Sequence, residues 1–201
     1  YSIFVGVPFT APTDNSTLKS YNIPDPSGIG EYRPWSVTEY NGDIYVGVVT
    51  TAEISGDTSS LAAYVYRLDE ASGLFTQIFS LPLTYTKGSS DASGDCIDIK
   101  EWRPWSDTFP QGCFGYYHTG INKEIRLVMD PQAILSSIAF DIDGSLILGF
   151  MDRFGLWAGY RNLRPKDDGR LYDGCVGGDV LRGQYNAFTD SYELESNGVS
   201  G

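Results

Sequence analysis

Two acidic residues, Glu53 and Asp152, are candidates for the paired carboxyl groups of a glycoside hydrolase. Glu53 and Asp152 each follow a long strand-like run, so both side chains would project at the same end of equivalent strands. Glycosidases need two carboxyl groups about 5–10 Å apart. A carbohydrate-active enzyme is therefore one hypothesis. The chain has 26 Asp and Glu, so a suitable pair also arises by chance, and we expect no catalysis.

The single histidine, His118, suggests a Ser-His-Asp triad as the other familiar chemistry. No G-x-S-x-G sequence accompanies it, and residues 116–119 are typical of a strand edge or a loop. We therefore expect a hydrogen-bonded loop histidine. One His and three scattered Cys also argue against a structural zinc site.

Clusters of aspartate suggest a hard metal ion. Asp91, Asp95 and Asp98 lie in a Gly/Ser-rich loop, and oxygen-rich flexible loops suit Ca²⁺. No cluster completes the EF-hand spacing, and Asp141 with Asp143 is explained by a hairpin turn. The loop at 91–98 thus remains a calcium candidate with a solvated loop as the alternative.

Aromatic side chains make up 14% of the chain and are the most suggestive group. Two Arg-Pro-Trp motifs occur, at 33–35 and 103–105, and Arg stacked on an indole is a favourable cation–π contact. Such side chains either anchor loops to the core or contact a ligand. The candidate contact residues are Tyr32, Arg33, Trp35, Trp102, Arg103, Trp105 and Trp157.

The cysteines and a sequon indicate the compartment. Cys96 and Cys113 flank one loop-like segment, and a disulfide between them would close it. Asn15 begins an Asn-Ser-Thr glycosylation sequence. These features, with the Ser, Thr and Tyr content, favour an extracellular protein; three free thiols in a cytosolic protein are the alternative. Cys175 then has no obvious partner.

Length and charge narrow the classes of function. The chain has 201 residues and a formal charge of −12, with only 14 Lys and Arg. This charge argues against nucleic-acid binding, which needs clustered Lys and Arg. No apolar run is long enough to span a membrane. Gly and Pro number 23 and 10, as in a turn-rich but folded domain.

The elements that would position these residues are strands. Helical periodicity is nearly absent, and strand patterns come in a group of four joined by short polar turns. Asn41-Gly42 is a strong hairpin signal between the first two. Four antiparallel strands within about 50 residues form the unit of a β-propeller blade. The predicted strands cover residues 36–40, 43–51, 61–68 and 74–81.

The pattern recurs after 102 residues, where Gly42–Val48 aligns with Gly144–Phe150. Gly47 and Gly149 coincide, as close approach between stacked sheets would require. We therefore predict an all-β chain with propeller-like four-stranded antiparallel blades, about two and a half of them, and long loop insertions. The predicted parts are the end of a preceding blade (1–24), a blade (35–82), a loop insertion (84–131), and a blade (134–197) with an insertion (154–177), all within a longer chain.

Several motifs in order resemble a known class of region. They are Ile23–Pro26, Gly30–Trp35, Tyr45–Val49, Ala63–Tyr66, Glu101–Trp105, Leu148–Gly155 and Gly178–Arg182. In this order they resemble a propeller-like region of large secreted bacterial surface proteins that often carry SdrD B-like domains. The resemblance covers most of residues 17–197. It implies a surface-associated extracellular module with propeller-like repeats and implies no reaction. Such regions tend to carry Cys after the first long strand, where this chain has Thr50 and Thr51.

These observations predict an extracellular or cell-surface module for binding or assembly. It would contact a protein or a glycan, without nucleic acid, membrane insertion or a required cofactor, with Ca²⁺ as the one candidate ion. Two alternatives remain: a fragment of a carbohydrate-active enzyme using Glu53 and Asp152, and a fibre subunit whose blades are completed by neighbouring copies.

Overall fold

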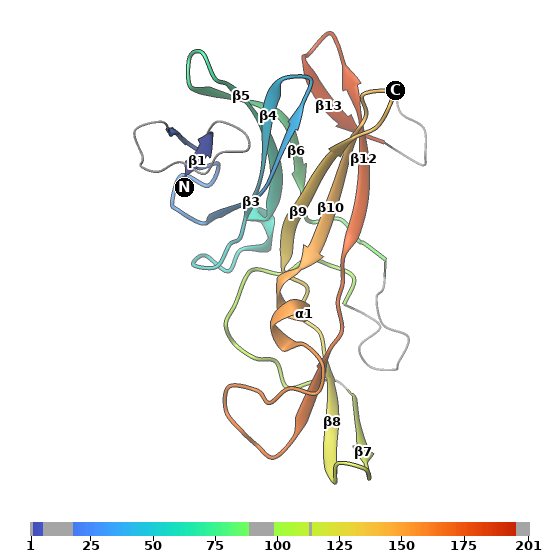
Figure 1. The fold of residues 1–201 in the computed structure, drawn as a ribbon. Helices are drawn as coiled ribbons and strands as arrows, with labels where there is room; N and C mark the ends of the chain where they lie inside the picture. The colour runs from blue at the N-terminus through green and yellow to red at the C-terminus, as the bar shows by residue number, and fades with distance from the viewer. Residues whose placement is uncertain (1, 6–17, 89–98, 113, 196–201) are drawn as a thin grey trace.

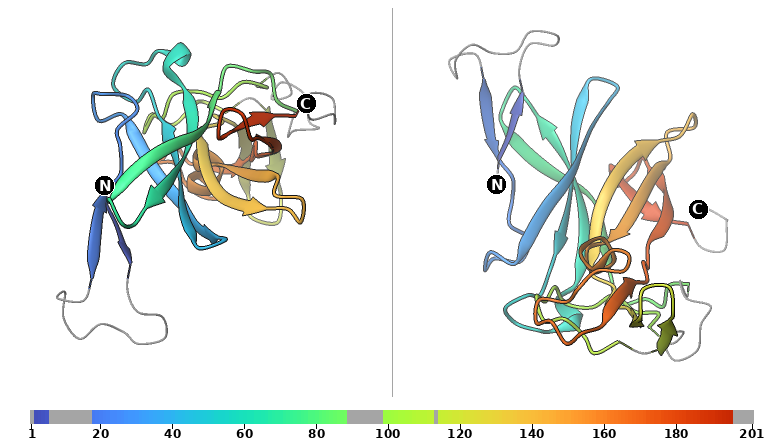
Figure 2. Two further views of the ribbon diagram at one scale, coloured as in Figure 1. Left: turned by 90° about the horizontal axis from the view of Figure 1, so that it is seen from above. Right: turned by 60° about the horizontal axis from the view of Figure 1, so that its bottom comes forward.

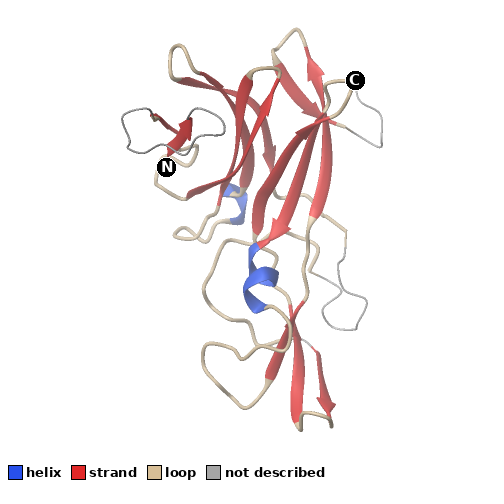
Figure 3. Cartoon of the chain, viewed as in Figure 1, coloured by secondary structure: helices blue, strands red, loops and turns tan. Residues whose placement is uncertain are grey.

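The computed structural model of the chain describes residues 2–5, 18–88, 99–112 and 114–195. Strands dominate this part of the chain (Figures 1 and 3). Its helices are the six-residue α1 (Arg153–Ala158) and the single 3-10 turn η2 (Thr58–Ser60). The prediction of an all-β protein is confirmed. Within the described ranges, no helix has the length and apolar character to cross a membrane.

Residues 32–82 form the first sheet, four antiparallel strands in which each strand pairs with the next along the chain. The opening hairpin turns at Asn41 and Gly42, whose φ angles are +53° and +87°. Asn and Gly tolerate positive φ, which a tight two-residue hairpin requires. The strands are β3 (Tyr32–Tyr40), β4 (Asp43–Thr50), β5 (Ala62–Asp69) and β6 (Leu74–Pro82).

The second sheet repeats this arrangement over residues 133–194. It is again antiparallel and again pairs each of its strands with the next, with α1 and a further strand inserted before its third strand. The two four-stranded sheets predicted from the sequence are therefore present. The strands are β9 (Ala133–Phe140), β10 (Leu146–Asp152), β12 (Asp179–Asn186) and β13 (Ser191–Leu194).

The two sheets share an irregularity at the same position. In the first hairpin Ser36 pairs with Gly47, and the register shifts at the adjoining residue Trp35. In the second hairpin Ser137 pairs with Gly149, and the register again shifts beside that pair. A β-bulge re-aims the strand and is a local, sequence-determined feature. Its recurrence supports the 102-residue repeat.

The main core lies between the two sheets, which face one another (Figure 2). Strand β3 lies beside β9, and β6 beside β13, so the strands are stacked in the same order. Tyr45 and Val49 of β4 pack toward Leu148 and Phe150 of β10. Between them, Gly47 leaves room for Leu135, because a Cβ on Gly47 would lie 2.7 Å from a Leu135 methyl carbon. The predicted close approach is confirmed for Gly47.

The two sheets stack head to tail, by which we mean that the face of one sheet contacts the non-equivalent face of the other. In the repeat, Val46 and Val48 correspond to Leu148 and Phe150. Leu148 and Phe150 face the first sheet, whereas Val46 and Val48 lie on the face of the first sheet that points away from the second. Gly149 likewise lies on the outer face of its sheet, and the predicted sheet contact at this residue is absent from the described part of the chain.

The two insertions are more ordered than loops and contact each other, which corrects the prediction for 84–131 and 154–177. Strand β11 pairs in parallel with β8, and β8 pairs with β7. Tyr172, Val128 and Phe154 share a small buried cluster. The pairing joins two insertions that are far apart in the sequence, so it could not be predicted from either one alone. The strands are β7 (Phe114–His118), β8 (Lys123–Val128) and β11 (Leu171–Gly174).

A separate hairpin precedes the first sheet. Strand β1 (Ser2–Val5) pairs with β2 (Lys19–Asn22) and lies on the side of the first sheet away from the second (Figure 2). The Tyr21 hydroxyl donates to the Glu70 carbonyl at 3.4 Å, and Ile23 packs with Val46 and Val48. Where the sequence predicts the end of a preceding blade (1–24), the structure has this two-stranded hairpin.

Candidate functional site

A polar pocket opens at the end of the two four-stranded sheets where β4 and β10 finish. It has a volume of about 490 Å³. Four elements meet here: the start of β3, the loop after β4, the excursion after β6, and the first turn of α1. We call it the Trp105 pocket; its lining residues are Arg33, Glu53, Trp105, Ser106, Asp107 and Arg153.

Trp105 is fixed to both sheets. Its backbone N–H donates to the Thr51 carbonyl at 2.9 Å, and its indole Nε1 donates to the Ala133 carbonyl at 2.9 Å. Thr51 directly follows β4, and Ala133 begins β9. A buried indole N–H needs a hydrogen-bond acceptor, and this bond holds the ring at the seam between the repeats.

Two guanidinium groups lie over the Trp105 ring. The Cζ of Arg153 is 5.0 Å from the ring centroid and that of Arg33 is 5.9 Å from it. Cations within about 6 Å of an indole centroid are attracted by its π face. The predicted Arg–Trp contact is therefore present, but across motifs: Arg33 of the first motif lies over Trp105 of the second.

Acidic residues balance these charges at the rim of the pocket. Arg33 forms an ion pair with Glu53, and Arg153 forms one with Asp107, whose side chain is 87% exposed. Arg153 also donates to the Gln132 side-chain oxygen at 2.6 Å. Two positive and two negative groups thus surround the pocket. Exposed ion pairs contribute little free energy, so a ligand can exchange them.

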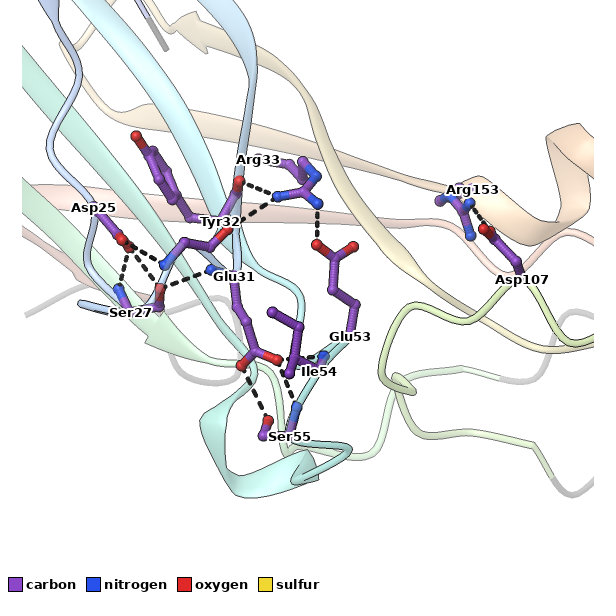
Figure 4. Close-up of polar contacts among 11 residues, drawn as sticks. Asp25, Ser27, Glu31, Tyr32, Arg33, Glu53, Ile54, Ser55, Asp107 and Arg153 are labelled. Carbon is purple, nitrogen blue, oxygen red and sulfur yellow. Dashed lines mark hydrogen bonds and ion pairs between the residues drawn. The ribbon is translucent and has the colours of Figure 1, made fainter.

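Loops behind the pocket are held by two carboxylates (Figure 4). Glu31 is buried and accepts the amide N–H groups of Ile54 and Ser55, the latter at 2.6 Å. Burial opposes ionisation of Glu31, but these hydrogen bonds outweigh it and lower its pKa. Asp25 in the same way accepts three amide N–H groups, including that of Gly30 at 2.7 Å. The backbones that carry Arg33 and Glu53 are therefore tied together.

The structure does not bring Glu53 and Asp152 into one site. Glu53 lines the Trp105 pocket, whereas Asp152 is fully buried at the start of α1. The Asp152 carboxylate accepts the amide N–H groups of Phe154 at 2.9 Å, Gln132 at 3.0 Å and Gly177 at 3.2 Å. It caps α1 and joins that helix to β9 and to the segment before β12, which is a structural arrangement.

The predicted contact residues divide by environment. Arg33 and Trp105 line the pocket. Trp35 is 60% exposed outside it, and Trp102 is 2% exposed in the main core, with Lys87 Nζ 5.0 Å from its ring centroid. Arg103 pairs with Asp130 at 3.2 Å. Tyr32 is half-buried on the outer face of the first sheet, and Trp157 packs against Phe109 and Phe154.

Sequence reasoning missed three of the pocket residues. Ser106 and Asp107 directly follow the second Arg-Pro-Trp motif, and Arg153 directly follows Asp152, which was singled out for another chemistry. The three missed residues are therefore direct sequence neighbours of predicted site residues. His118 is the last residue of strand β7, and its buried Nδ1 has no hydrogen-bond partner among the described residues, so the expectation of a hydrogen-bonded loop histidine is wrong.

Several predicted sites lie outside the described residues. These are the disulfide between Cys96 and Cys113, the calcium candidates Asp91, Asp95 and Asp98, and the glycosylation residue Asn15. Cys175 is half-buried after β11, and its backbone N–H donates to Val128 O at 2.8 Å. In the ranges that the structure describes, no three His, Cys, Asp or Glu side chains gather as metal ligands.

Two Dictyostelium discoideum proteins are similar to the chain. Colossin-C is 27% identical over 127 residues, which cover 62% of this chain and 10% of that protein. Colossin-A is 22% identical over 125 residues, covering 62% of this chain and 1% of that protein. The chain thus spans a tenth or less of the length of these relatives. No family model and no solved structure matches the chain.

Proposed function

We propose that the chain is a propeller-type binding or assembly module of a cell surface or extracellular matrix, with the Trp105 pocket as its contact site for a glycan or a protein. The observation that carries the proposal is the placement of Arg33 and Arg153, one from each repeat, over the indole of Trp105. The pocket therefore exists only when both sheets are stacked.

The head-to-tail stacking supports the propeller part of the proposal. In a ring of blades, each sheet meets its neighbour with unlike faces, as the two sheets do here. The pocket lies at the end with the long connections, and the tight hairpins lie at the other end. Long loops on a rigid scaffold are the usual place for contact residues.

The chemistry of the pocket favours a ligand rich in both donors and acceptors. Two guanidinium groups offer fork-shaped donors, and the carboxylates of Glu53 and Asp107 offer acceptors. A polyhydroxylated glycan or the backbone of a peptide satisfies both. The balanced charge of the lining does not select a strongly charged ligand.

Relatives and composition supply weaker support. The colossins are many times longer than this chain, which accords with a module carried in a larger protein. The extracellular location is proposed from the sequon at Asn15 and the acidic, Ser/Thr-rich composition.

Binding of the labelled chain to an array of defined oligosaccharides and immobilised extracellular-matrix proteins tests the proposal. We expect the double variant R33A/R153A to reduce binding at least tenfold, because it removes both donor groups. The matched control is R103A, which removes an equally cationic side chain from an ion pair outside the pocket. Equal binding by the double variant and the control would refute the assigned site.

Assembly into a fibre is favoured by a separate observation. The outer face of the second sheet bears Val180, which is 72% exposed, beside Gly149 and Met151. A sheet of the same type could cover this face, as the second sheet covers the first. Sedimentation velocity over a range of concentrations tests this candidate: association with rising concentration supports it, and a monomer throughout argues against it.

A further inference from the structure

A second hollow lies between the two sheets at the hairpin end, opposite the Trp105 pocket. It has a volume of about 280 Å³ and is bordered by the hairpins at residues 40–43 and 143–144 and by strand β13 with its preceding turn. We call it the tyrosine hollow. The lining residues that matter for its chemistry are Tyr40, Tyr45, Tyr185, Tyr192, Asp43 and Asp143.

The walls of the tyrosine hollow are aromatic and well packed. The rings of Tyr185 and Tyr192 are 5.3 Å apart between centroids. Phe140 supports the other side: its ring lies 4.1 Å from that of Tyr40 and 6.0 Å from that of Tyr192. Tyr185 is 44% exposed, so part of its π surface is open to an incoming group. The negative face of an aromatic ring attracts cations.

The charge of the lining is negative. Three carboxylates, on Asp43, Asp143 and Asp190, face one guanidinium, that of Arg67. Arg67 pairs with Asp190 at 2.7 Å. Asp143 receives Arg182 from outside the hollow. The carboxylate of Asp43 interacts electrostatically with Arg67 but forms no hydrogen bond or ion pair with the described residues, so its oxygens can still accept a ligand's N–H groups.

The guanidinium of Arg67 is a positively charged group of the chain itself that already lies in the tyrosine hollow. The Arg67 guanidinium binds Asp190, and the hydroxyl of Tyr185 also donates to Asp190 at 2.8 Å. Asp43 and Arg67 also border a neighbouring hollow of about 540 Å³, which adds Asp69 and Glu70. The negatively charged surface thus continues from the tyrosine hollow into this neighbouring hollow.

From this combination of tyrosine walls with a carboxylate that forms no ion pair among the described residues, we propose that the tyrosine hollow binds an alkylammonium group, carried by a lysine side chain of a partner polypeptide or by a free polyamine. The ammonium group would lie between Asp43 and the exposed face of Tyr185, and its hydrocarbon stem would contact Ile78 and Tyr45. This site is independent of the Trp105 pocket, so failure of one leaves the other untouched.

NMR titration of the labelled chain distinguishes the two sources. The probes are Nα-acetyl-lysine methylamide and spermidine, and the neutral control is the lysine probe acetylated at Nε. We expect saturable shifts at Asp43 and Tyr185 with either or both charged probes and none with the acetylated probe. The charged probe that shifts these residues identifies the source. The proposal would be overturned if neither charged probe shifts these residues, or if the neutral control shifts them equally.

Variants locate the binding within the molecule. D43N should weaken binding of the charged probe about threefold to fivefold, as expected for loss of one exposed ion pair. Y185L should weaken it about twofold to fivefold through loss of the cation–π contact. D107N removes the same charge at the opposite end and should leave binding unchanged. If D43N and D107N have equal effects, only general charge attraction operates and the site is refuted.

Discussion

At the scale of single residues, the same side-chain type has different roles according to its surroundings. Glu53 and Asp152 follow equivalent strands, yet Glu53 reaches the Trp105 pocket and Asp152 is buried under three amide N–H groups. A buried carboxylate with such partners organises backbone, and its removal leaves polar groups without partners. We therefore infer that Asp152 stabilises the fold.

Asp152 should make stability depend on pH in an unusual direction. Burial raises its pKa above the ordinary value, although the amide groups of Gln132, Gly177 and Phe154 oppose the shift. The folded state then binds this proton more tightly than the unfolded state. The resulting stabilisation is fully present below the pKa of the unfolded state and is lost as the pH rises through the folded pKa. Urea denaturation at several pH values should show wild type losing stability relative to D152N as the pH rises.

Asp57 provides the control of opposite sign. Its pKa is lowered by hydrogen bonds from the Ser59 hydroxyl and amide. Its stabilisation is present above the unfolded value and lost as the pH falls through the folded pKa. Wild type should therefore gain stability relative to D57N as the pH rises. If D152N and D57N shift in the same direction, the assignment for Asp152 is wrong.

Residue types were easier to predict than their environments. The two Arg-Pro-Trp motifs were found from sequence, and Arg33 and Trp105 do lie in one pocket. Which Trp is buried depends on contacts with segments far along the chain, so Trp102 and Trp35 could not be told apart. Arg153 was missed because its partner Trp105 lies 48 positions earlier, and the sequence carries no local sign of that contact.

At the scale of elements, local signals predicted well and long-range pairing did not. The hairpin at Asn41-Gly42 and the order β3–β6 follow from adjacent residues, and so does the repeat in β9 and β10. The parallel pairing of β8 with β11 joins segments more than 40 residues apart. Each segment alone shows only a short apolar run, which is equally compatible with a loop.

The excursion after β6 should depend strongly on its buried aromatic residue Trp102. Trp102 lies in the main core, and its indole N–H donates to the Tyr85 hydroxyl at 3.2 Å. W102A should lower the free energy of unfolding by about 3–5 kcal/mol, as for other buried aromatic truncations. W35A, which removes a 60% exposed tryptophan of the first Arg-Pro-Trp motif, should change it by less than about 0.5 kcal/mol. Equal effects in chemical denaturation would contradict this assignment.

At the scale of the whole molecule, the repeat and the stacking together define which surfaces remain open. Because the inner contact joins unlike faces, the first sheet keeps the Val46/Val48 face and the second sheet keeps the Gly149 face. The former is covered in part by Ile23 and flanking tyrosines. The latter has Val180 and Met151 toward solvent. The open face of the second sheet thus corresponds to the face of the first sheet that is covered inside the chain, as the proposed stacking of further sheets requires.

Alanine substitutions at the two equivalent glycines, Gly47 and Gly149, test the difference in packing between the covered face and the open face. In G47A the new methyl group would lie 2.2 Å from Ser36 Oγ and would also collide with Leu135, so we expect a loss of about 1–3 kcal/mol in urea denaturation. In G149A the methyl group meets Ser137 Oγ at 2.3 Å, but Ser137 is exposed and can rotate away, so the loss should stay below about 1 kcal/mol. If copies stack through the second sheet, G149A should also weaken their association in sedimentation while G47A should not. Equal losses in stability for the two variants would show that the outer face is already as closely packed as the inner one.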